Sequence, residues 1–239
     1  MPIFVLNEEI LFPPVNLAIR EGILAVGGDL SPERLLKAYS EGIFPWYSED
    51  EPIVWWSPDP RFVLLPEGIK VSRTMRQVIS RNIFTITFDR AFREVITSCS
   101  TIDRAHQYGT WITDEMREAY CRLHDMGYAH SVEAWHGGEL AGGLYGLSLG
   151  RCFFGESMFA KKSNASKAAF IVLVKKLQEL GFIIVDAQVY TRHLESLGAF
   201  EMPRDEYIAV LRKGLQFETI QGSWSGLLGG NTDGSDGIN

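Results

Sequence analysis

The sequence has few cysteines, no long apolar run and no excess of positive charge. Its three cysteines, Cys99, Cys121 and Cys152, are too few and too widely spaced for a disulfide framework and favour a reducing compartment. The apolar run at Phe170–Val174 is far shorter than the roughly 20 residues that a membrane-spanning helix needs. A formal net charge of −7 excludes a global basic field for nucleic acid and leaves only a local basic patch open.

A targeting signal is also missing. The N-terminus, MPIFVLNEEILFPP, has no basic segment and carries Glu8 and Glu9, unlike a signal peptide. With 46% hydrophobic and 22% charged residues among 239, the composition is that of a globular protein with a full core. We therefore expect a cytoplasmic monomer, built as one large domain or two unequal ones.

Several catalytic and cofactor motifs are absent. No G-x-G-x-x-G follows a predicted strand, and there is no Walker loop. The segment GESMF contains Ser157 but lacks the second glycine of a nucleophile elbow. His124, His130 and His136 recur at six-residue spacing, without a C-x-x-C or H-E-x-x-H motif beside them. We expect these to be surface or cap histidines, and no metal site.

The clearest pattern present is a strand–helix–strand unit over residues 155–189. A helix should begin near Ser163 or Asn164, which are N-cap residue types, and end at Gly181. One face of this helix carries an apolar stripe: Phe170, Leu173, Val174, Leu177 and Leu180. After Gly181 the period changes to two, so that Asp186 and Gln188 share one face of an otherwise apolar strand.

Two polar groups on such a strand need partners. A crossover of this length favours a parallel pairing between the second strand and the one that precedes the helix, which carries Glu156. Glu156, Asp186 and Gln188 can then converge, and an unpaired buried polar group would cost about 2–7 kcal/mol. Structural acids satisfied by backbone amides, lysine or arginine are the alternative for any one of them. Three such groups together favour a functional site.

The rest of the chain divides into three parts. Residues 1–61 should form a small N-terminal domain with a helix near 31–40 and a rigid aromatic loop containing Trp46, Trp55 and Trp56, which could be a packed seam between domains. Residues 62–220 have the pattern of a mixed α/β domain. Residues 221–239 are rich in Gly, Ser and Asp and predict a disordered tail. The larger domain should contain strands near 62–65, 84–88, 130–135, 139–148 and 150–159, helices near 72–80, 90–99 and 113–125, and a final hydrophobic segment near 207–211.

Several blocks occur in an order that resembles one known family. They read VGGDLSPERLLKAYSEGIFPWYS, IVWWSPDPRF, GTWIT, GGLYG, GESMF, NASK, DAQV and SLGA, and they cover roughly residues 12 to 211. In this order the chain resembles the leucyl/phenylalanyl-tRNA–protein transferases. The resemblance implies a GNAT-like mixed sheet with flanking helices behind a small N-terminal domain. It also implies transfer of Leu, Phe or Met from aminoacyl-tRNA to the N-terminal Arg or Lys of a protein, which then enters the N-degron pathway.

The same resemblance assigns roles at the reaction centre. Gln188 would hydrogen-bond the attacking amine, Asp186 would orient Gln188 and draw charge, and Glu156 would hold the aminoacyl ester end. Both acids could instead attract the cationic N-terminus of the acceptor, so a recognition role competes with a catalytic one. An aminoacyl ester is already activated, so the reaction needs no cofactor.

The donor substrate implies further contacts. Candidates for an apolar side-chain pocket are Phe153, Met158, Phe170, Leu173 and Val185, although each alone is more often ordinary core. By resemblance, Trp46 and Trp111 stack on the terminal adenosine, with Tyr120 nearby. The tRNA body would meet a basic cluster, Lys70, Arg73, Arg76 and Arg81. Because the chain as a whole is acidic, we expect weak, salt-sensitive tRNA binding.

Two other functions compete with this one. A small-molecule N-acyltransferase could use the same fold, but the loop KKSNASK lacks the glycines with which acetyl-CoA-dependent GNAT enzymes hold a pyrophosphate. A non-catalytic tRNA-binding module would keep the tryptophans and the basic cluster. It would have no use for Asp186 and Gln188. The transferase is therefore the favoured interpretation.

Overall fold

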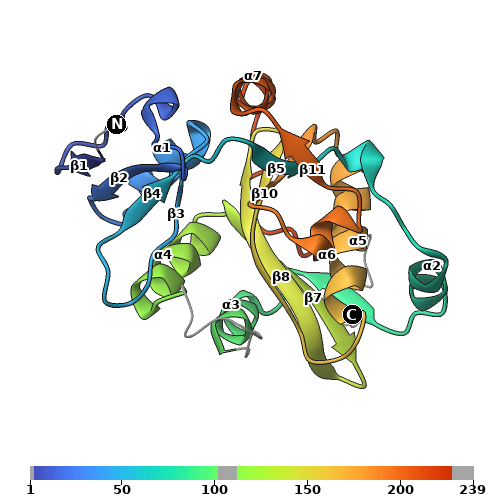
Figure 1. Cartoon of the computed structure of the whole chain (residues 1–239). Helices are drawn as coiled ribbons and strands as arrows, with labels where there is room; N and C mark the ends of the chain where they lie inside the picture. The colour runs from blue at the N-terminus through green and yellow to red at the C-terminus, as the bar shows by residue number, and fades with distance from the viewer. Residues whose placement is uncertain (1–2, 102–111, 228–239) are drawn as a thin grey trace, which may run out of the picture.

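The computed structural model describes residues 3–101 and 112–227, and these form two β-sheets with helices packed around them (Figure 1). The smaller sheet belongs to the N-terminal part of the chain. Its order is β1 (Phe4–Leu6), β2 (Ile23–Gly27), β4 (Val54–Trp56) and β3 (Phe44–Pro45).

The larger sheet has seven strands and is mostly antiparallel. Its order is β11 (Phe200–Met202), β5 (Arg61–Leu64), β10 (Ile184–Gln188), β9 (Cys152–Ala160), β8 (Glu139–Leu149), β7 (Ala129–His136) and β6 (Thr85–Phe88). The central pair β9 and β10 is parallel, with Ile184 opposite Cys152 and Asp186 opposite Phe154. The parallel pairing predicted for these two strands is therefore confirmed.

Helices cover both faces of the larger sheet (Figure 1). The described residues form α1 (Pro32–Ser40) in the N-terminal part, and α2 (Arg73–Ser80), α3 (Phe92–Thr101), α4 (Asp114–Asp125), α5 (Ala165–Glu179), α6 (Arg192–Glu195) and α7 (Arg204–Gly214) after it, with short 3-10 turns η1 (Val15–Leu17) and η2 (Pro66–Gly68). α5 packs on one face, and α3 and α4 pack on the other. The mixed α/β class is as predicted, and the parallel pair joined by α5 is compatible with the GNAT-like arrangement.

α5 agrees with the helix predicted from the apolar stripe. Phe170, Leu173, Val174 and Leu177 are all buried against the sheet. The helix ends at Glu179, and Gly181 follows with a φ of +75°, a conformation that favours glycine. The chain then turns directly into β10.

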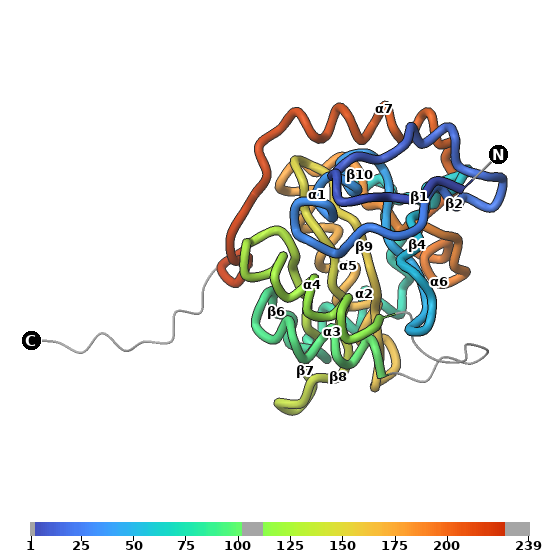
Figure 2. The backbone as a smooth tube through the Cα atoms, turned by 90° about the vertical axis from the view of Figure 1, so that its left-hand side faces the viewer, coloured from blue at the N-terminus to red at the C-terminus, as the bar shows by residue number. Residues whose placement is uncertain are grey.

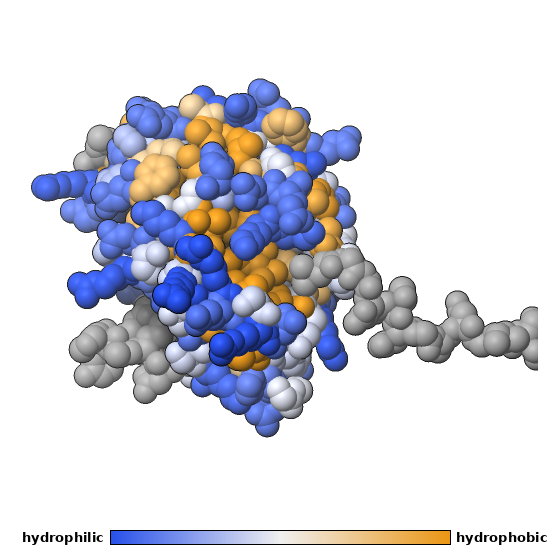
Figure 3. Space-filling view, turned by 90° about the vertical axis from the view of Figure 1, so that its right-hand side faces the viewer, coloured by the Kyte–Doolittle hydropathy of each residue, from blue (hydrophilic) through white to orange (hydrophobic). Residues whose placement is uncertain are grey.

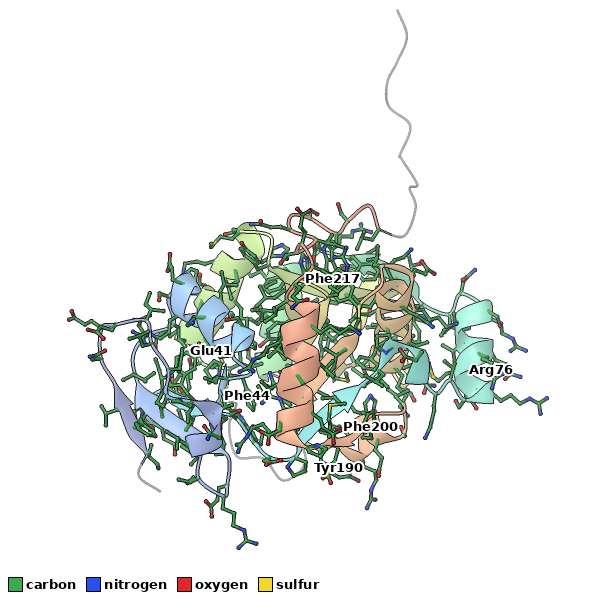
Figure 4. All side chains as sticks on the ribbon, turned by 90° about the horizontal axis from the view of Figure 1, so that it is seen from above. Glu41, Phe44, Arg76, Tyr190, Phe200 and Phe217 are labelled. Atoms are coloured by element: carbon green, nitrogen blue, oxygen red, sulfur yellow. The ribbon has the colours of Figure 1, made fainter. Side chains whose placement is uncertain are left out.

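The N-terminal part and the larger sheet share one hydrophobic core. α7 lies beside α1 and the start of β3 (Figures 2 and 4). Gly42, with a φ of +78°, permits this approach, because a Cβ there would lie 2.6 Å from Cδ1 of Ile208. Core residues of α1 and β3 consequently pack with residues of β9 and α7 in a single cluster.

The C-terminal segment differs from the prediction. Disorder was expected from residue 221 onward, and this is wrong for residues 221–227, since Trp224 is only 1% exposed. Its ring stacks on His130 at 3.7 Å, and its backbone N–H donates to Asp89 Oδ2 at 2.7 Å. His130 is accordingly buried, and the expectation of a surface or cap histidine is wrong at this position. The rest of the predicted tail, 228–239, lies outside the described residues.

The outer face seen in Figure 3 carries a band of apolar side chains among polar ones. A surface groove of about 420 Å³ lies between α2, β6 and α5. Its apolar lining residues are Val78, Ile79, Phe84, Ile86 and Val172. In the ranges 3–101 and 112–227, no helix combines the length and the hydropathy needed to cross a bilayer.

Candidate active site

A cavity lies where β9 and β10 separate. Their pairing ends at Asp186 and Phe154, whereas β9 continues to Ala160. The space between the diverging strands has a volume of about 680 Å³ and is lined from both sides, by Gly155–Ala160 and by 185–191. Glu156, Asp186 and Gln188 are among the residues that line this cavity, whose walls are largely apolar.

Each strand is irregular at the residues that carry the polar groups. In β10, Asp186 pairs with Val63 and Gln188 with Phe62, which leaves Ala187 as an extra residue. Gln188 adopts a φ of +65°. In β9, Gly155 and Ser157 pair with consecutive residues of β8, so Glu156 is the extra residue there. Bulges of this kind turn a side chain out of the regular alternation and occur often beside active sites.

Asp186 is fully buried, and its carboxylate is saturated by hydrogen bonds. Oδ1 accepts from Arg61 Nε and from the backbone N–H of Gln188, both at 2.9 Å. Oδ2 accepts from Arg61 Nη2 at 2.7 Å and from the Tyr207 hydroxyl at 2.8 Å. Asp186 therefore orients Gln188 through its main chain, and the left-handed conformation of Gln188 is held by this contact.

Arg61 is the buried cation that balances Asp186. Its guanidinium lies between the rings of Phe44 and Tyr207, at 4.6 and 4.8 Å from their centroids. Burial acts to lower the pKa of Arg61, but the attraction of Asp186 outweighs burial, and the pKa rises. The pair is thus a neutral, bidentate unit in the floor of the site.

Glu156 collects three donors from three other elements. Oε1 accepts from the Tyr39 hydroxyl at 2.7 Å and from Gln188 Nε2 at 2.8 Å. Oε2 accepts from the Tyr120 hydroxyl at 2.9 Å, and the oxygen atoms of the two tyrosine hydroxyls lie against each other. Glu156 therefore fixes the side-chain amide of Gln188, as Asp186 fixes its backbone.

The environment of Glu156 changes its acidity. Burial raises the pKa of Glu156 to about 7, and the nearby charge of Asp186 acts in the same direction. The hydroxyls of Tyr39 and Tyr120 and the amide of Gln188 act in the opposite direction, because they stabilise the carboxylate. A carboxyl group with a pKa near neutrality beside a cavity is a common feature of functional sites.

Comparison with known proteins identifies the family. A model of the leucyl/phenylalanyl-tRNA protein transferase family matches residues 63–212, and a model of the N-terminal domain of that family matches residues 28–59. The chain belongs to this family. The two matched ranges lie on either side of the domain boundary predicted at residue 61, and the resemblance noted in the sequence is confirmed.

Curated relatives carry the same family name and similar lengths. A leucyl/phenylalanyl-tRNA–protein transferase of Syntrophus aciditrophicus is 59% identical over 94% of this chain and 94% of its own. Transferases of Desulfatibacillum aliphaticivorans and Myxococcus xanthus are 56% and 53% identical, each over 94% of this chain and 97% of their own.

Most of the predicted donor-pocket residues do line the cavity. Phe153, Met158, Phe170 and Val185 contribute to its wall. Leu173 does not line it and is a core residue with no exposed surface. Its place on the buried stripe of α5 explains the difference, because the cavity is lined by earlier residues of the helix, Ser166 and Phe170.

The predicted aromatic residues have different positions. Trp46 lines the cavity and packs against Trp56 at 5.8 Å between ring centroids. Tyr120 is fully buried beneath Glu156 and does not line the cavity, so its contact with the site is the hydrogen bond to that carboxylate. Trp111 lies outside the described residues.

The predicted basic cluster is exposed on and beside α2. Lys70, Arg73, Arg76 and Arg81 all face solvent. Figure 4 shows Arg76 pointing away from the protein at the end opposite the N-terminal sheet. None of the four lines the cavity, so a ligand that met both would have to extend across the surface between them.

Sequence reasoning missed three residues of the site. Arg61, Tyr39 and Tyr207 complete the network around Asp186 and Glu156. The predicted burial of Asp186 indicates that this acid needs a positively charged partner, but the sequence does not indicate which residue that partner is. Among the described residues, no three histidine, cysteine, aspartate or glutamate side chains gather closely enough to hold a metal ion.

Proposed function

We propose that this chain is an aminoacyltransferase that moves leucine, phenylalanine or methionine from aminoacyl-tRNA to the N-terminal Arg or Lys of a protein. The observation that carries the proposal is the Glu156–Gln188–Asp186 network that lines an apolar cavity, in a chain of the leucyl/phenylalanyl-tRNA–protein transferase family. The product is a protein marked for N-degron degradation, and the reaction belongs in the cytoplasm.

The reaction is the aminolysis of an ester. The α-amine of the acceptor attacks the carbonyl carbon, a C–N bond forms, the bond to the 3′-oxygen of the tRNA breaks, and one amine proton ends on that oxygen. The α-amine has an ordinary pKa of about 7.7–8.0, so an appreciable fraction is neutral near pH 7. Positioning of the two substrates can therefore supply most of the rate.

Gln188 is suited to position the amine. Its Nε2 donates to Glu156, and this contact leaves Oε1 as the group that matches an N–H donor on the acceptor. The bulge at Ala187 and the bond from the backbone of Gln188 to Asp186 hold the residue in place. Asp186 cannot receive the amine proton directly, because its four hydrogen bonds occupy the carboxylate.

The apolar wall is suited to the side chain of the donor. Phe153, Met158, Phe170 and Val185 offer a surface for a hydrophobic side chain that is unbranched at Cβ, and Trp46 offers an aromatic face for the adenosine. The arginines on α2 would meet phosphates of the tRNA body.

The test is transfer of labelled Phe from Phe-tRNA to a peptide that begins with Arg, compared with a peptide that begins with Ala. Gln188→Ala and the core variant Leu173→Ile are measured in parallel. We expect labelling of the Arg peptide alone, its loss in Gln188→Ala and its retention in Leu173→Ile. Protein that binds Phe-tRNA but labels neither peptide would instead be a tRNA-binding module.

A further inference from the structure

The acceptor of the proposed reaction carries a long cationic side chain, and the two acids inside the cavity are poorly placed to bind it. Asp186 is neutralised by Arg61 through two hydrogen bonds. Glu156 accepts from two tyrosines and from Gln188, and its pKa of about 7 leaves it only partly charged at neutral pH. Recognition of a guanidinium or ammonium group requires a carboxylate with free lone pairs and full charge.

The exposed carboxylate of Glu195 lies beside the cavity, next to Leu194, which lines it. Tyr190 lines the cavity, is 51% exposed and packs edge-on against Phe62, with ring centroids 5.3 Å apart. Its hydroxyl donates to Glu195 Oε2 at 2.8 Å. Glu195 is exposed at the end of α6, and a carboxylate can accept about four hydrogen bonds, so capacity remains for a cationic ligand. In Figure 4, Tyr190 lies at the edge of the protein.

The spacing along the chain suits an arginine or lysine side chain. Tyr190 follows Gln188 by two residues, and two residues of extended chain span at most about 7 Å. An amine held at Gln188 would thus have its side chain within reach of the Tyr190 ring and of Glu195. An aromatic face and a carboxylate together form a favourable environment for a guanidinium.

We infer that Tyr190 and Glu195 form the binding site for the cationic side chain of the acceptor's N-terminal residue. The inference rests on the proposed function and identifies the residues that would distinguish Arg or Lys from other N-terminal residues of the acceptor. Phe62 holds the Tyr190 ring from behind, and Tyr190 in turn holds the Glu195 carboxylate beside the cavity.

Arg192 provides a matched control on the same helix. It also acts on the Tyr190 hydroxyl: the hydrogen bond to Glu195 raises the pKa of Tyr190, whereas Arg192 lowers it. Both side chains are exposed, so neither substitution should disturb the core. Glu195 should attract the acceptor and Arg192 should repel it, whereas nonspecific damage to α6 would change both variants in the same direction.

The experiment measures KM and kcat for an Arg peptide and for a peptide that begins with citrulline, which has a similar shape and no charge. Glu195→Gln should raise KM for the Arg peptide by roughly two- to five-fold, the range expected for an exposed ion pair, with kcat nearly unchanged. Arg192→Gln should lower that KM. The preference for Arg over citrulline should fall in Glu195→Gln.

The inference is overturned if both variants shift KM in the same direction, or if Glu195→Gln keeps the wild-type preference for Arg over citrulline. Failure of the proposed function would look different, because the wild type would then label no peptide at all. In that case the affinity of the fluorescently labelled Arg peptide, measured by anisotropy for the same variants, still tests the site. Equal affinities of wild type and Glu195→Gln would reject it.

Discussion

Arg61 holds Asp186 through two parallel hydrogen bonds of 2.9 and 2.7 Å, and neither side chain is more than 1% exposed. Removing one member of such a pair leaves an uncompensated buried charge, which costs about 3–5 kcal/mol of stability. Arg61→Met should therefore lower the free energy of unfolding by that amount in urea denaturation.

The exposed ion pair between Arg93 and Glu118, at 2.6 Å, gives the control for this substitution. Its side chains are 62% and 48% exposed, so Arg93→Met should hardly change the free energy of unfolding. If Arg61→Met and Arg93→Met had equal free energies of unfolding, the Arg61–Asp186 pair would contribute no more to stability than the exposed pair. Because Asp186→Ala also unpairs a charge, any activity loss in that variant has to be compared at equal folded fractions.

Glu156 makes the stability of the protein depend on pH. Its pKa is about 7 in the folded protein and about 4.3 when unfolded, so the folded state binds this proton more tightly. The stability that this group contributes is complete below about pH 4.3 and is lost as the pH rises through 7. Between pH 5 and 8, wild type should lose on the order of 2–3 kcal/mol relative to Glu156→Gln, as measured by denaturant unfolding at each pH. A difference that stays constant with pH would contradict the raised pKa.

Trp224 anchors the C-terminal segment to the larger sheet. Its ring stacks on His130 and lies 6.1 Å from each of the Phe153 and Phe182 rings. Trp224→Ala should therefore destabilise the protein by about 3–5 kcal/mol, the usual loss for a buried aromatic residue. The free energy of unfolding is measured for both variants by thermal denaturation. Phe217→Ala removes an aromatic ring that is 50% exposed and should lower that free energy much less. Similar losses would mean that Trp224 contributes no more than a surface residue.

The same tryptophan shows where sequence reasoning fails. A segment rich in Gly, Ser and Asp has the composition of a disordered chain, and composition averages over the single large residue that anchors it. His130 was misjudged for a related reason, because its stacking partner lies in that segment. The strand–helix–strand unit, in contrast, could be predicted, since periodicity and Gly181 are local signals.

The partners of the site could not be predicted in this way. Tyr39 and Glu156 are 117 residues apart in the chain, and Arg61 and Asp186 are 125 apart. Buried acids require donors, but which donors arrive depends on how α1 and β5 pack against β9 and β10. The bulges at Glu156 and Ala187 could not be predicted either, because the alternation of side chains along a strand does not show where an extra residue is inserted.

The basic residues of α2 should control the salt dependence of tRNA binding. Removal of one phosphate-binding side chain should reduce the slope of log K against log salt concentration by about 0.7–0.9. Arg73→Gln combined with Arg76→Gln should therefore reduce the slope by about 1.5, measured with Phe-tRNA. Arg212→Gln, an exposed arginine on α7, is the control and should leave the slope unchanged. An unchanged slope in the double variant would place the tRNA elsewhere.

Tyr39 connects the N-terminal part of the chain to the reaction centre. It comes from α1, has no exposed surface, and donates to Glu156 at 2.7 Å. A hydrogen bond to a charged group contributes about 1.5–3 kcal/mol, so Tyr39→Phe should lower kcat/KM for transfer by at least tenfold. The pKa of Glu156 should also rise, because the Tyr39 hydroxyl opposes the effect of burial.

Tyr47→Phe is the matched substitution in the same part of the chain. Within residues 3–101 and 112–227, its hydroxyl makes one long contact of 3.5 Å with Thr113 and none with Glu156, so activity should be retained. Tyr39→Phe and Tyr120→Phe should not be additive, since both hydroxyls bind the same carboxylate and lie against each other. If the double variant instead showed the product of the two single effects, the tyrosines would act independently. Glu156 would then need no joint support from α1 and α4 to position Gln188.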